Sequence, residues 1–465
     1  MTMSHWSNAA ELPPSVVSTL EHHKLDPAGL SVFAQEIGGD VVLSFNSDQP
    51  RNPASTMKVV TGLAALEILR PGYRWQTRFY SDAEPSNGVL NGDIYLVGGG
   101  DPYLVQERVW LMLQALKRRG VTTIAGDLVL DDSLFEPIIE DTGAFDNQPF
   151  RIYNALPSAV LTNFNSTYFV FRPSGNRVAI EAFPEMPDLS INNQLRIAQR
   201  SCGGYRRGIA LSMQKANVAR FDGRFPNRCR RYGFTRSVLA PETYTAGLIR
   251  SLWTQLGGEL EGKTRVGTPG DEAYRLLTFD SLNAGDVTRL MNKHSSNLIA
   301  RHLLLTMGGE QFGWPATEHN GRKAITEWLD RKGLVFPELI IENGAGRSRD
   351  ARISARNLTR LVIAGYQSQY MPEFLASLAL LGQDGTLDDR HQRTSLNGKA
   401  HLKTGRLDHV TAIAGVMQNR HGKRFALTVF HNDHNVHRGL GEAVQDSLLQ
   451  WLDNYSGPAA ATGSP

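Results

Sequence analysis

The pattern of apolar and polar residues predicts regular structure early in the chain. Apolar, β-like runs at 30–37 and 40–45 are separated by Gly38 and Gly39. Two consecutive glycines can adopt the positive φ angles of a two-residue turn, so the segment predicts a tight hairpin. Residues 55–69 follow with apolar side chains at most positions, which predicts a helix buried on most of its sides.

A long middle stretch of the chain has a different pattern. It consists of short β-like runs broken by Gly, Asn, Asp and Pro, with one helical run at 104–118. Because α/β patterns lie on both sides of it, we predict a discontinuous domain made of 1–70 and 240–465, with a β-rich insertion at 71–239. Beyond the insertion, helices are expected at 244–256, 284–290, 296–307, 316–332, 355–364 and 439–451, and strands at 400–417 and 424–431.

Composition places the chain among ordinary globular proteins. Of its 465 residues, 41% are hydrophobic, 8% aromatic and 20% charged, which excludes a wholly disordered or collagen-like chain. The length suggests about three domains. The apolar runs are too short for a helix that spans a membrane. The net charge of +3 is too small for the whole molecule to be a binder of polyanions.

Residues 196–236, called the basic segment below, concentrate positive charge. They include eleven Lys and Arg residues and a single acid, Asp222. Such a segment could bind a polyanion through phosphate contacts, with its aromatic side chains stacking on bases. The alternative is a solvated face whose aromatic residues belong to the core of small strands. No nucleic-acid-binding motif accompanies the segment, so we expect no nucleic-acid partner.

The chain has two cysteines, Cys202 and Cys229, without the spacing of a zinc site. We predict that they form a disulfide, which would require an oxidising compartment, and two free thiols are the alternative. No segment before Pro13 has a charged region followed by an apolar one. We therefore expect an export signal to be absent or already removed.

Ser55 and Lys58 form an SxxK motif, which places a hydroxyl and an amine one helical turn apart on the same face. The amine can act as a base near neutral pH only if burial or another cation lowers its pKa, and the apolar helix offers that burial. Ser55 also lies at the helix start, where free backbone N–H groups could stabilise an oxyanion. The alternative is a helix-capping serine followed by a surface lysine. A second match, Ser212 to Lys215, precedes no buried helix and is interpreted as accidental.

Ser295, Ser296 and Asn297 form an SxN tripeptide just before a long apolar helix. The Ser295 hydroxyl could relay a proton toward a leaving amine, and the Asn297 carboxamide could hold an amide of the substrate. The SxN pattern also occurs at other positions of this chain. Taken alone, a helix cap is the simpler interpretation.

Lys403, Thr404 and Gly405 form the single KTG sequence of the chain, inside a strand-like run. Lysine on a strand edge supplies a positive charge for a carboxylate and lowers the pKa of a neighbouring amine. Threonine adds a hydroxyl for the same carboxylate, and glycine lets a substrate lie against the strand. The backbone N–H of Arg406 could be a second oxyanion donor.

In the order SxxK, SxN, KTG, these motifs jointly supply a nucleophile, a base, a proton relay, oxyanion donors and a carboxylate receptor. At this point the sequence resembles the penicillin-recognising serine acyl-enzymes, and specifically the low-molecular-mass class C penicillin-binding proteins of the peptidase S13 type. These are D-alanyl-D-alanine carboxypeptidase/endopeptidases. The resemblance covers nearly the whole chain and includes the segments 98–104, 126–132, 343–349 and 384–387.

This resemblance implies an α/β fold. We expect a transpeptidase/β-lactamase-like domain with a five-stranded antiparallel sheet flanked by helices. The insertion would hold two small β-rich domains, one of them at about 90–165. The resemblance also implies a periplasmic enzyme that uses no metal or organic cofactor. Its expected partners are peptidoglycan stem peptides and cross-links, and β-lactam antibiotics, and peripheral membrane association is compatible with it.

The resemblance assigns roles to individual residues. It implies that Ser55, Lys58 and Ser295 are catalytic. Two positions depart from the pattern of similar proteins, which usually have Asp where this chain has Ser296 and Ser or Thr where it has Arg406. Arg406 could reach toward a substrate carboxylate. Arg349 lies in a segment that resembles a substrate-facing loop, although a surface role fits it equally. The expected substrate-binding residues are Asn297, Lys403, Thr404, Gly405, Arg406 and Arg349.

Two other functions are compatible with the sequence. A serine β-lactamase or esterase on the same fold would need fast deacylation, and the sequence has no clear glutamate dedicated to that step. A non-catalytic protein that binds the cell wall or a polyanion would use the basic segment as its working surface.

Overall fold

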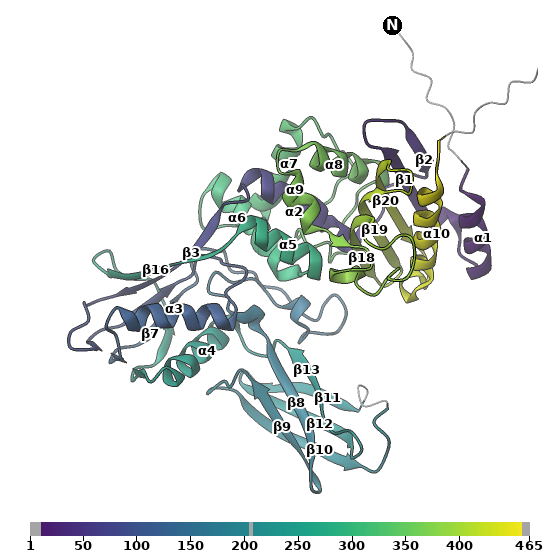
Figure 1. Cartoon of the computed structure of the whole chain (residues 1–465). Coiled ribbons are helices and arrows are strands. Elements are labelled where there is room, and N and C mark those ends of the chain that lie inside the picture. Colours follow the sequence, from purple (N-terminus) through teal and green to yellow (C-terminus); the bar gives the residue numbers. More distant parts are fainter. Residues whose placement is uncertain (1–10, 204–207, 458–465) are drawn as a thin grey trace, which may run out of the picture. The chain divides into compact units, whose positions relative to one another are not determined.

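The computed structural model describes residues 11–203 and 208–457. The described chain divides into two compact units. Among the described residues, unit 1 is formed by 11–73, 283–312 and 318–457, and unit 2 by 74–203, 208–282 and 313–317. Each unit is described by itself below, with the elements labelled as in Figure 1.

Unit 1 is built around one antiparallel sheet with the strand order β17-β18-β19-β20-β1-β2. Five long strands confirm the predicted five-stranded sheet, and β17, a two-residue edge strand too short to leave a pattern in the sequence, is added to them. The predicted hairpin is β1 and β2. The strands are β1 (Leu30–Glu36), β2 (Val41–Phe45), β17 (Ala379–Leu380), β18 (Ala400–Leu407), β19 (Val410–Gln418) and β20 (Arg424–Asn432).

Helices cover both faces of this sheet (Figure 1). Alternate residues of a strand point to opposite faces, and Val32 and Ala34 pack into one core with side chains of α1 and α10. On the other face, α8 packs against β1, β19 and β20, and α2 packs against α5 and α6. The helices of unit 1 are α1 (Pro14–His23), α2 (Met57–Ile68), α5 (Ala284–His294), α6 (Asn297–Phe312), α7 (Glu318–Arg331), α8 (Ala355–Gln367), α9 (Met371–Ser377) and α10 (Leu440–Asn454).

Helix α2 is buried along most of its length, as its apolar pattern predicts. Every residue from Met57 to Leu66 is buried, including the charged-type side chain of Lys58. The helix begins two residues later than predicted, because residues 54–56 form a short 3-10 turn, η2 (Ala54–Thr56), that leads into it. Ser55 therefore lies in the turn that opens a buried helix.

Unit 2 contains a five-stranded sheet with the order β15-β7-β5-β3-β16 and a three-stranded sheet with the order β14-β6-β4. Helices α3 and α4 pack against each other. The elements are α3 (Gln106–Arg118), α4 (Pro241–Gln255), β3 (Arg74–Ser81), β4 (Val89–Leu90), β5 (Ile94–Val97), β6 (Thr123–Ile124), β7 (Leu128–Asp131), β14 (Glu259–Leu260), β15 (Thr264–Val266) and β16 (Tyr274–Asn283).

Two further three-stranded sheets, β10-β12-β11 and β13-β8-β9, complete unit 2. Their strands all lie between residues 167 and 236. The strands are β8 (Thr167–Ser174), β9 (Arg177–Phe183), β10 (Ser190–Ala198), β11 (Ile209–Lys215), β12 (Val218–Pro226) and β13 (Tyr232–Arg236).

The extent of unit 2 differs from the predicted insertion at 71–239. Unit 2 continues to Leu282, because β15 pairs in parallel with β7 and α4 packs against α3. The prediction assigned residues 240–282 to the returning α/β domain because they begin with a helical pattern. The segment nested within the remainder of unit 2 is 167–236 rather than 90–165, since strands on both sides of it share one five-stranded sheet.

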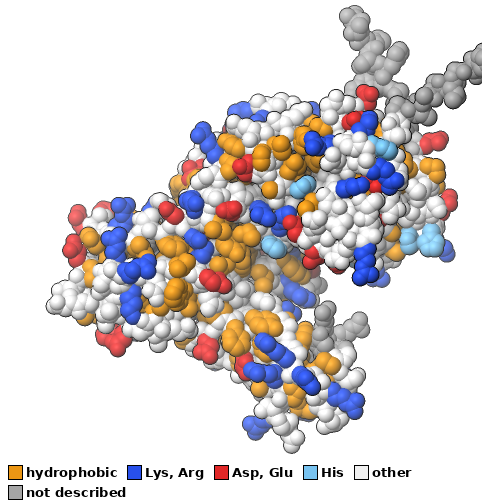
Figure 2. All heavy atoms as spheres, viewed as in Figure 1, with side chains coloured by type: hydrophobic (Ala, Val, Ile, Leu, Met, Phe, Trp, Pro, Cys, Tyr) orange, Lys and Arg blue, Asp and Glu red, His pale blue; other side chains and the backbone are white. Residues whose placement is uncertain are grey.

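The aromatic residues of the basic segment lie in a core. Phe221 and Phe225 are fully buried, and the rings of Phe221 and Phe234 pack against Phe169 and Phe171. This arrangement favours the solvated-face interpretation over base stacking. In the face shown in Figure 2, Lys and Arg side chains are spread over this part of the surface rather than joined in one continuous patch. Tyr205, Arg206 and Arg207 lie outside the described residues.

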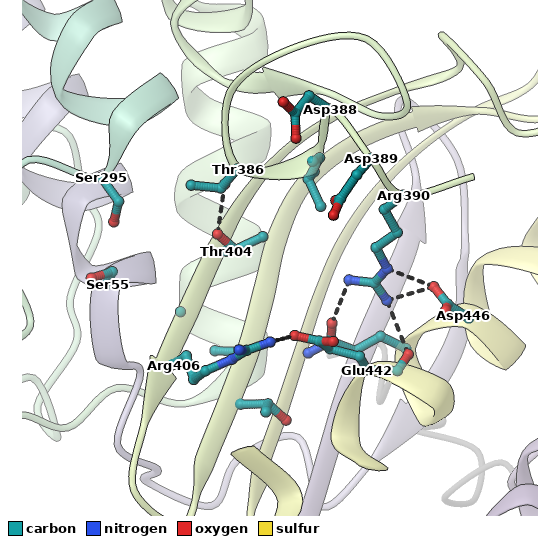
Figure 3. Close-up of a pocket in the computed structure, with 15 residues that line it drawn as sticks. Ser55, Ser295, Thr386, Asp388, Asp389, Arg390, Thr404, Arg406, Glu442 and Asp446 are labelled. Carbon is teal, nitrogen blue, oxygen red and sulfur yellow. Dashed lines mark hydrogen bonds and ion pairs between the residues drawn. The ribbon is translucent and has the colours of Figure 1, made fainter. Parts of the chain in front are cut away.

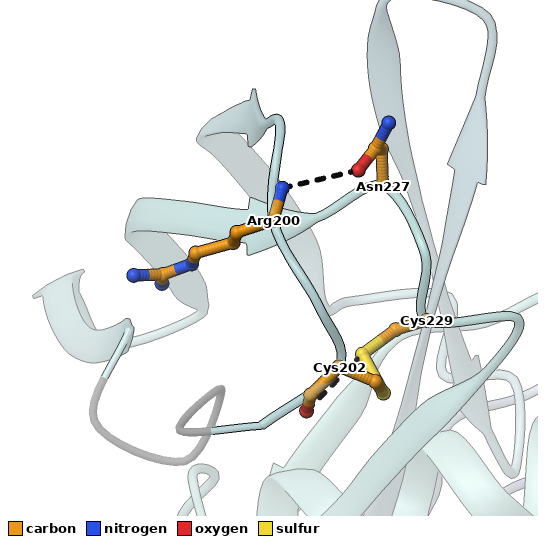
Figure 4. The surroundings of a disulfide bond; sticks show 4 residues. All are labelled: Arg200, Cys202, Asn227 and Cys229. Atoms are coloured by element: carbon orange, nitrogen blue, oxygen red, sulfur yellow. Dashed lines mark hydrogen bonds between the residues drawn. A yellow bond between two sulfur atoms is a disulfide. The ribbon is translucent and has the colours of Figure 1, made fainter.

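Cys202 and Cys229 form a disulfide, as predicted (Figure 4). The bridge joins the segment after β10 to the connection between β12 and β13. Beside it, the backbone N–H of Arg200 donates to the Asn227 side chain at 3.3 Å. The bridge therefore closes a loop that contains β11 and β12.

Replacing both cysteines by serine is expected to lower the free energy of unfolding by about 3 kcal/mol, because the unfolded chain would regain the entropy that the closed loop removes. Denaturant titration of the oxidised wild type and the double variant measures the difference. A reducing agent should destabilise the wild type by a similar amount and leave the double variant unchanged. Equal midpoints for the two oxidised proteins would contradict the expectation.

None of the helices that the structure describes combines the length and the apolar character needed to cross a lipid bilayer.

Candidate active site

Unit 1 holds a cavity of about 720 Å³ at the edge of β18 (Figure 3). It is lined by η2, the turn between α5 and α6, the loop before β18, strands β18 and β19, and the first turns of α10. Among the predicted site residues, Ser55, Ser295, Thr404, Gly405 and Arg406 line it. Three stretches that lie far apart in the sequence therefore meet at one cavity.

Ser55 and Lys58 are in contact at the start of α2. The Lys58 Nζ lies 3.0 Å from the Ser55 Oγ. It also donates to the Asn297 Oδ1 at 2.7 Å and to the backbone carbonyl of Ala345 at 2.6 Å. A neutral amine has two N–H donors and one lone pair. With both donors used by Asn297 and Ala345, the lone pair is left to accept the proton of the Ser55 hydroxyl.

The surroundings of Lys58 favour that neutral form. The side chain is fully buried. Burial lowers the pKa of Lys58 well below its usual value of 10.5, and the positive charge of Lys403 lowers it further. Burial also lowers the pKa of Lys403, to about 7. The protonated Lys403 therefore favours the neutral form of Lys58, which is the form that can act as a base.

Ser295 connects the second lysine to the site. The Lys403 Nζ donates to the Ser295 Oγ at 2.9 Å and to the backbone carbonyl of Thr404 at 2.8 Å. Ser295 ends α5 in the left-handed region, with φ of 55°, which turns the chain between α5 and α6. The helix-capping contact at α6 is made by Ser296, whose Oγ accepts from the backbone N–H of Ile299 at 3.3 Å. Ser295 thus lines the cavity, and its hydroxyl accepts a hydrogen bond from Lys403.

Strand β18 comes unusually close to the start of α2. A side chain on Gly405 would place its Cβ 2.7 Å from the carbonyl oxygen of Pro53 and 3.0 Å from the backbone nitrogen of Ser55. Any residue larger than glycine would push the strand away from the nucleophile. Glycine is therefore required for the edge of β18 to lie beside the backbone N–H of Ser55.

The arginines predicted to bind substrate are placed differently from each other. Arg406 lines the cavity, and its guanidinium forms an ion pair with Glu442 of α10 (Figure 3). Arg349 is not among the residues that line this cavity. Its guanidinium lies 3.9 Å from the carboxylate of Asp408, in the turn between β18 and β19.

Two of the cavity residues that the sequence did not indicate contact the KTG strand directly. Thr386, in the loop before β18, has its Oγ1 2.7 Å from the Oγ1 of Thr404. Thr386 lies in the segment 384–387, which carries part of the family resemblance, but the resemblance assigns Thr386 no catalytic or binding role. Glu442 had no signal in the sequence, because its link to Arg406 joins positions that form no motif. Among the described residues, no three His, Cys, Asp or Glu side chains are arranged to hold a metal ion.

Comparison with known proteins gives consistent results. The D-alanyl-D-alanine carboxypeptidase DacB of Haemophilus influenzae is 25% identical over 444 residues, which cover 94% of this chain and 92% of the relative. A D-alanyl-D-alanine carboxypeptidase of Actinomadura sp. is 26% identical over 476 residues, covering 98% of this chain and 86% of the relative. The crystal structure of penicillin binding protein 4 from H. influenzae has the same fold, with a TM-score of 0.82 at 24% identity over 95% of this chain and 99% of that one.

The family description "D-Ala-D-Ala carboxypeptidase 3 (S13)" matches residues 14–455. The matched range includes every strand and helix of unit 1 and all three motifs that meet at the cavity. The chain therefore belongs to the D-Ala-D-Ala carboxypeptidase 3 (S13) family, the class C penicillin-binding proteins of the S13 type.

Proposed function

We propose that this protein is a serine DD-peptidase that removes the terminal D-Ala from peptidoglycan stem peptides and/or hydrolyses the cross-links between D-Ala and a diamino acid, through an acyl-enzyme on Ser55. The contact of 3.0 Å between the Ser55 hydroxyl and the fully buried Lys58 amine carries the proposal. Family membership and the names of the relatives support the reaction class.

In the acylation step, the Ser55 Oγ attacks the carbonyl carbon of the D-alanyl bond, and its proton passes to the Lys58 Nζ. The oxygen that becomes negative is stabilised by backbone N–H groups, those of Ser55 and Arg406. The C–N bond then breaks, and the proton that Lys58 took from Ser55 reaches the leaving amine through the Ser295 hydroxyl, which Lys403 contacts, so that Lys58 is neutral again.

Substrate binding uses three residues of the KTG and SxN motifs. Lys403 and Thr404 hold the carboxylate of the leaving D-Ala, and Asn297 holds an amide on the acylated side. In the second step, water attacks the ester, releases the shortened peptide and restores Ser55. A β-lactam acylates Ser55 in the same way, because its strained amide resembles the D-alanyl bond.

The test combines mass spectrometry with turnover. After exposure to penicillin, we expect one penicilloyl group per chain, mapped to Ser55, and release of D-Ala from a D-Ala-D-Ala peptide much faster than hydrolysis of nitrocefin. The reverse ratio would favour a β-lactamase. Salt-sensitive polyanion binding without any peptidase activity would favour a binding protein. Labelling of a residue other than Ser55 would contradict the assigned nucleophile.

We further propose that the protein works in the periplasm. The disulfide between Cys202 and Cys229 supports this location, because disulfides persist in oxidising compartments. Peptidoglycan, the proposed substrate, also lies there.

A further inference from the structure

A second threonine hydroxyl lies against the KTG strand. The Oγ1 atoms of Thr386 and Thr404 are 2.7 Å apart, and both residues line the cavity that contains Ser55 (Figure 3). Arg406 is on the same face of β18 as Thr404, since residues two apart on a strand point the same way. Arginine has no hydroxyl, so at these two positions the strand offers a carboxylate only the hydroxyl of Thr404.

The loop that carries Thr386 is held firmly. The carboxylate of Asp384 accepts two hydrogen bonds from the Lys293 Nζ, at 2.8 and 2.5 Å, and one from the backbone N–H of Leu380 at 2.7 Å. The Lys293 side chain is largely buried. These contacts tie the loop to the end of α5, two residues before Ser295.

The backbone of the loop also packs against that helix end. Gly385 has a φ of 61°, and a Cβ at this position would lie 2.7 Å from the carbonyl oxygen of Lys293. Both the left-handed backbone and the close approach require glycine. The position of the Thr386 hydroxyl is thus set by the same helix end that positions Ser295.

We propose that Thr386 supplies a second hydroxyl to the carboxylate receptor, beside Thr404, and that Asp384 is the residue that positions it. This inference rests on the proposed function. In the free enzyme one hydroxyl donates to the other. When a leaving group that ends in a carboxylate enters, both O–H groups can donate to its two oxygens, which together accept up to about four hydrogen bonds. Hydrogen bonds to a charged acceptor are the stronger kind, so Thr386 favours leaving groups that carry this carboxylate.

The experiment compares two thiolesters of N-acyl-D-Ala, whose leaving groups end in a carboxylate or in the neutral carboxamide. Thiolesters are reactive enough for the neutral member to be turned over measurably. For Thr386→Val we expect kcat/KM on the carboxylate substrate to fall about tenfold or more, from the lost hydrogen bond to a charged group. Turnover of the carboxamide should change by less than about twofold, the rest of the site being intact. Thr386→Ser should restore selectivity.

A structural role for Thr386 would lower both rates together, so an equal loss on the two substrates would overturn the inference, as would full activity of Thr386→Val on the carboxylate. Asp384→Asn should weaken the ion pair with Lys293 and lower the same selectivity. Thr326→Val is the matched control, because Thr326 is an exposed threonine of α7 whose hydroxyl bonds within its own helix.

The failure of this inference can be told apart from failure of the proposed function. If the wild type is acylated by penicillin at Ser55 and releases D-Ala while Thr386→Val keeps the wild-type selectivity, only the role of Thr386 is wrong. If the wild type turns over neither thiolester and releases no D-Ala, the proposed function fails and the role of Thr386 fails with it.

Discussion

Replacing Ser55 by alanine is expected to abolish labelling by penicillin and to lower the release of D-Ala by at least about ten-thousandfold, because no acyl-enzyme can form without its hydroxyl. The Oγ is the atom that contacts Lys58, and it lies in the turn before a buried helix. Removing it deletes no buried polar partner other than Lys58, so the fold should persist. Gel fluorography with a fluorescent penicillin and a D-Ala release assay measure the two effects.

Ser212 offers a matched control for this experiment. It begins the second SxxK match of the chain, but it is exposed on strand β11 and does not lie at the start of a buried helix. Ser212→Ala should therefore label and hydrolyse like the wild type. Persistent labelling of Ser55→Ala, or a loss of labelling in Ser212→Ala, would show that the wrong motif has been assigned.

Replacing Lys58 by methionine is expected to lower the acylation rate by about a hundredfold to ten-thousandfold, the range that a positioned base contributes. Methionine keeps much of the length and packing of the side chain, but the Asn297 Oδ1 and the Ala345 carbonyl lose their donor, so the free energy of unfolding should fall by about 1–3 kcal/mol. Stopped-flow measurement of penicillin acylation gives the rate, and thermal unfolding checks the fold. Lys323→Met, at an exposed position of α7, is the control that should leave the rate unchanged.

The pH profile of the wild type should report both lysines. Lys58 is active as a base when it has lost its proton, and its pKa is held well below 10.5. Acylation should therefore rise with pH through that lowered pKa and be lost as the pH falls below it. Lys403 attracts a carboxylate only while protonated, and its pKa is about 7. For substrates with a carboxylate, kcat/KM should fall again at higher pH, which gives a bell-shaped profile.

Lys58→Met should remove the rising limb of this profile. A rising limb of unchanged position in Lys58→Met would mean that another group is the base. A profile that rises only near pH 10 in the wild type would contradict the lowered pKa of Lys58.

Much of the fold and of the site was predictable because its signals are local. A two-glycine turn between apolar runs specified the β1–β2 hairpin, and a nearly continuous apolar pattern specified the burial of α2. The SxxK, SxN and KTG motifs could be found because each is a short run of neighbouring residues in the sequence. The boundary of unit 2 was not predictable in this way. The pairing of β15 with β7 joins strands that lie far apart in the sequence, and the helical pattern at 244–256 does not reveal which unit the helix packs in.

By itself, the sequence determined the types of element, the residues with chemistry and their order along the chain, because helix and strand periodicity and short motifs are properties of neighbouring residues. Only the tertiary structure decided which of those residues share a cavity. Thr386 meets Thr404 and Arg406 pairs with Glu442, whereas Arg349 lies beside Asp408. The burial that lowers the pKa of Lys58 likewise depends on Asn297 and Ala345, which reach it from other parts of the chain. Such contacts follow from how the elements pack, and spacing along the chain does not encode them.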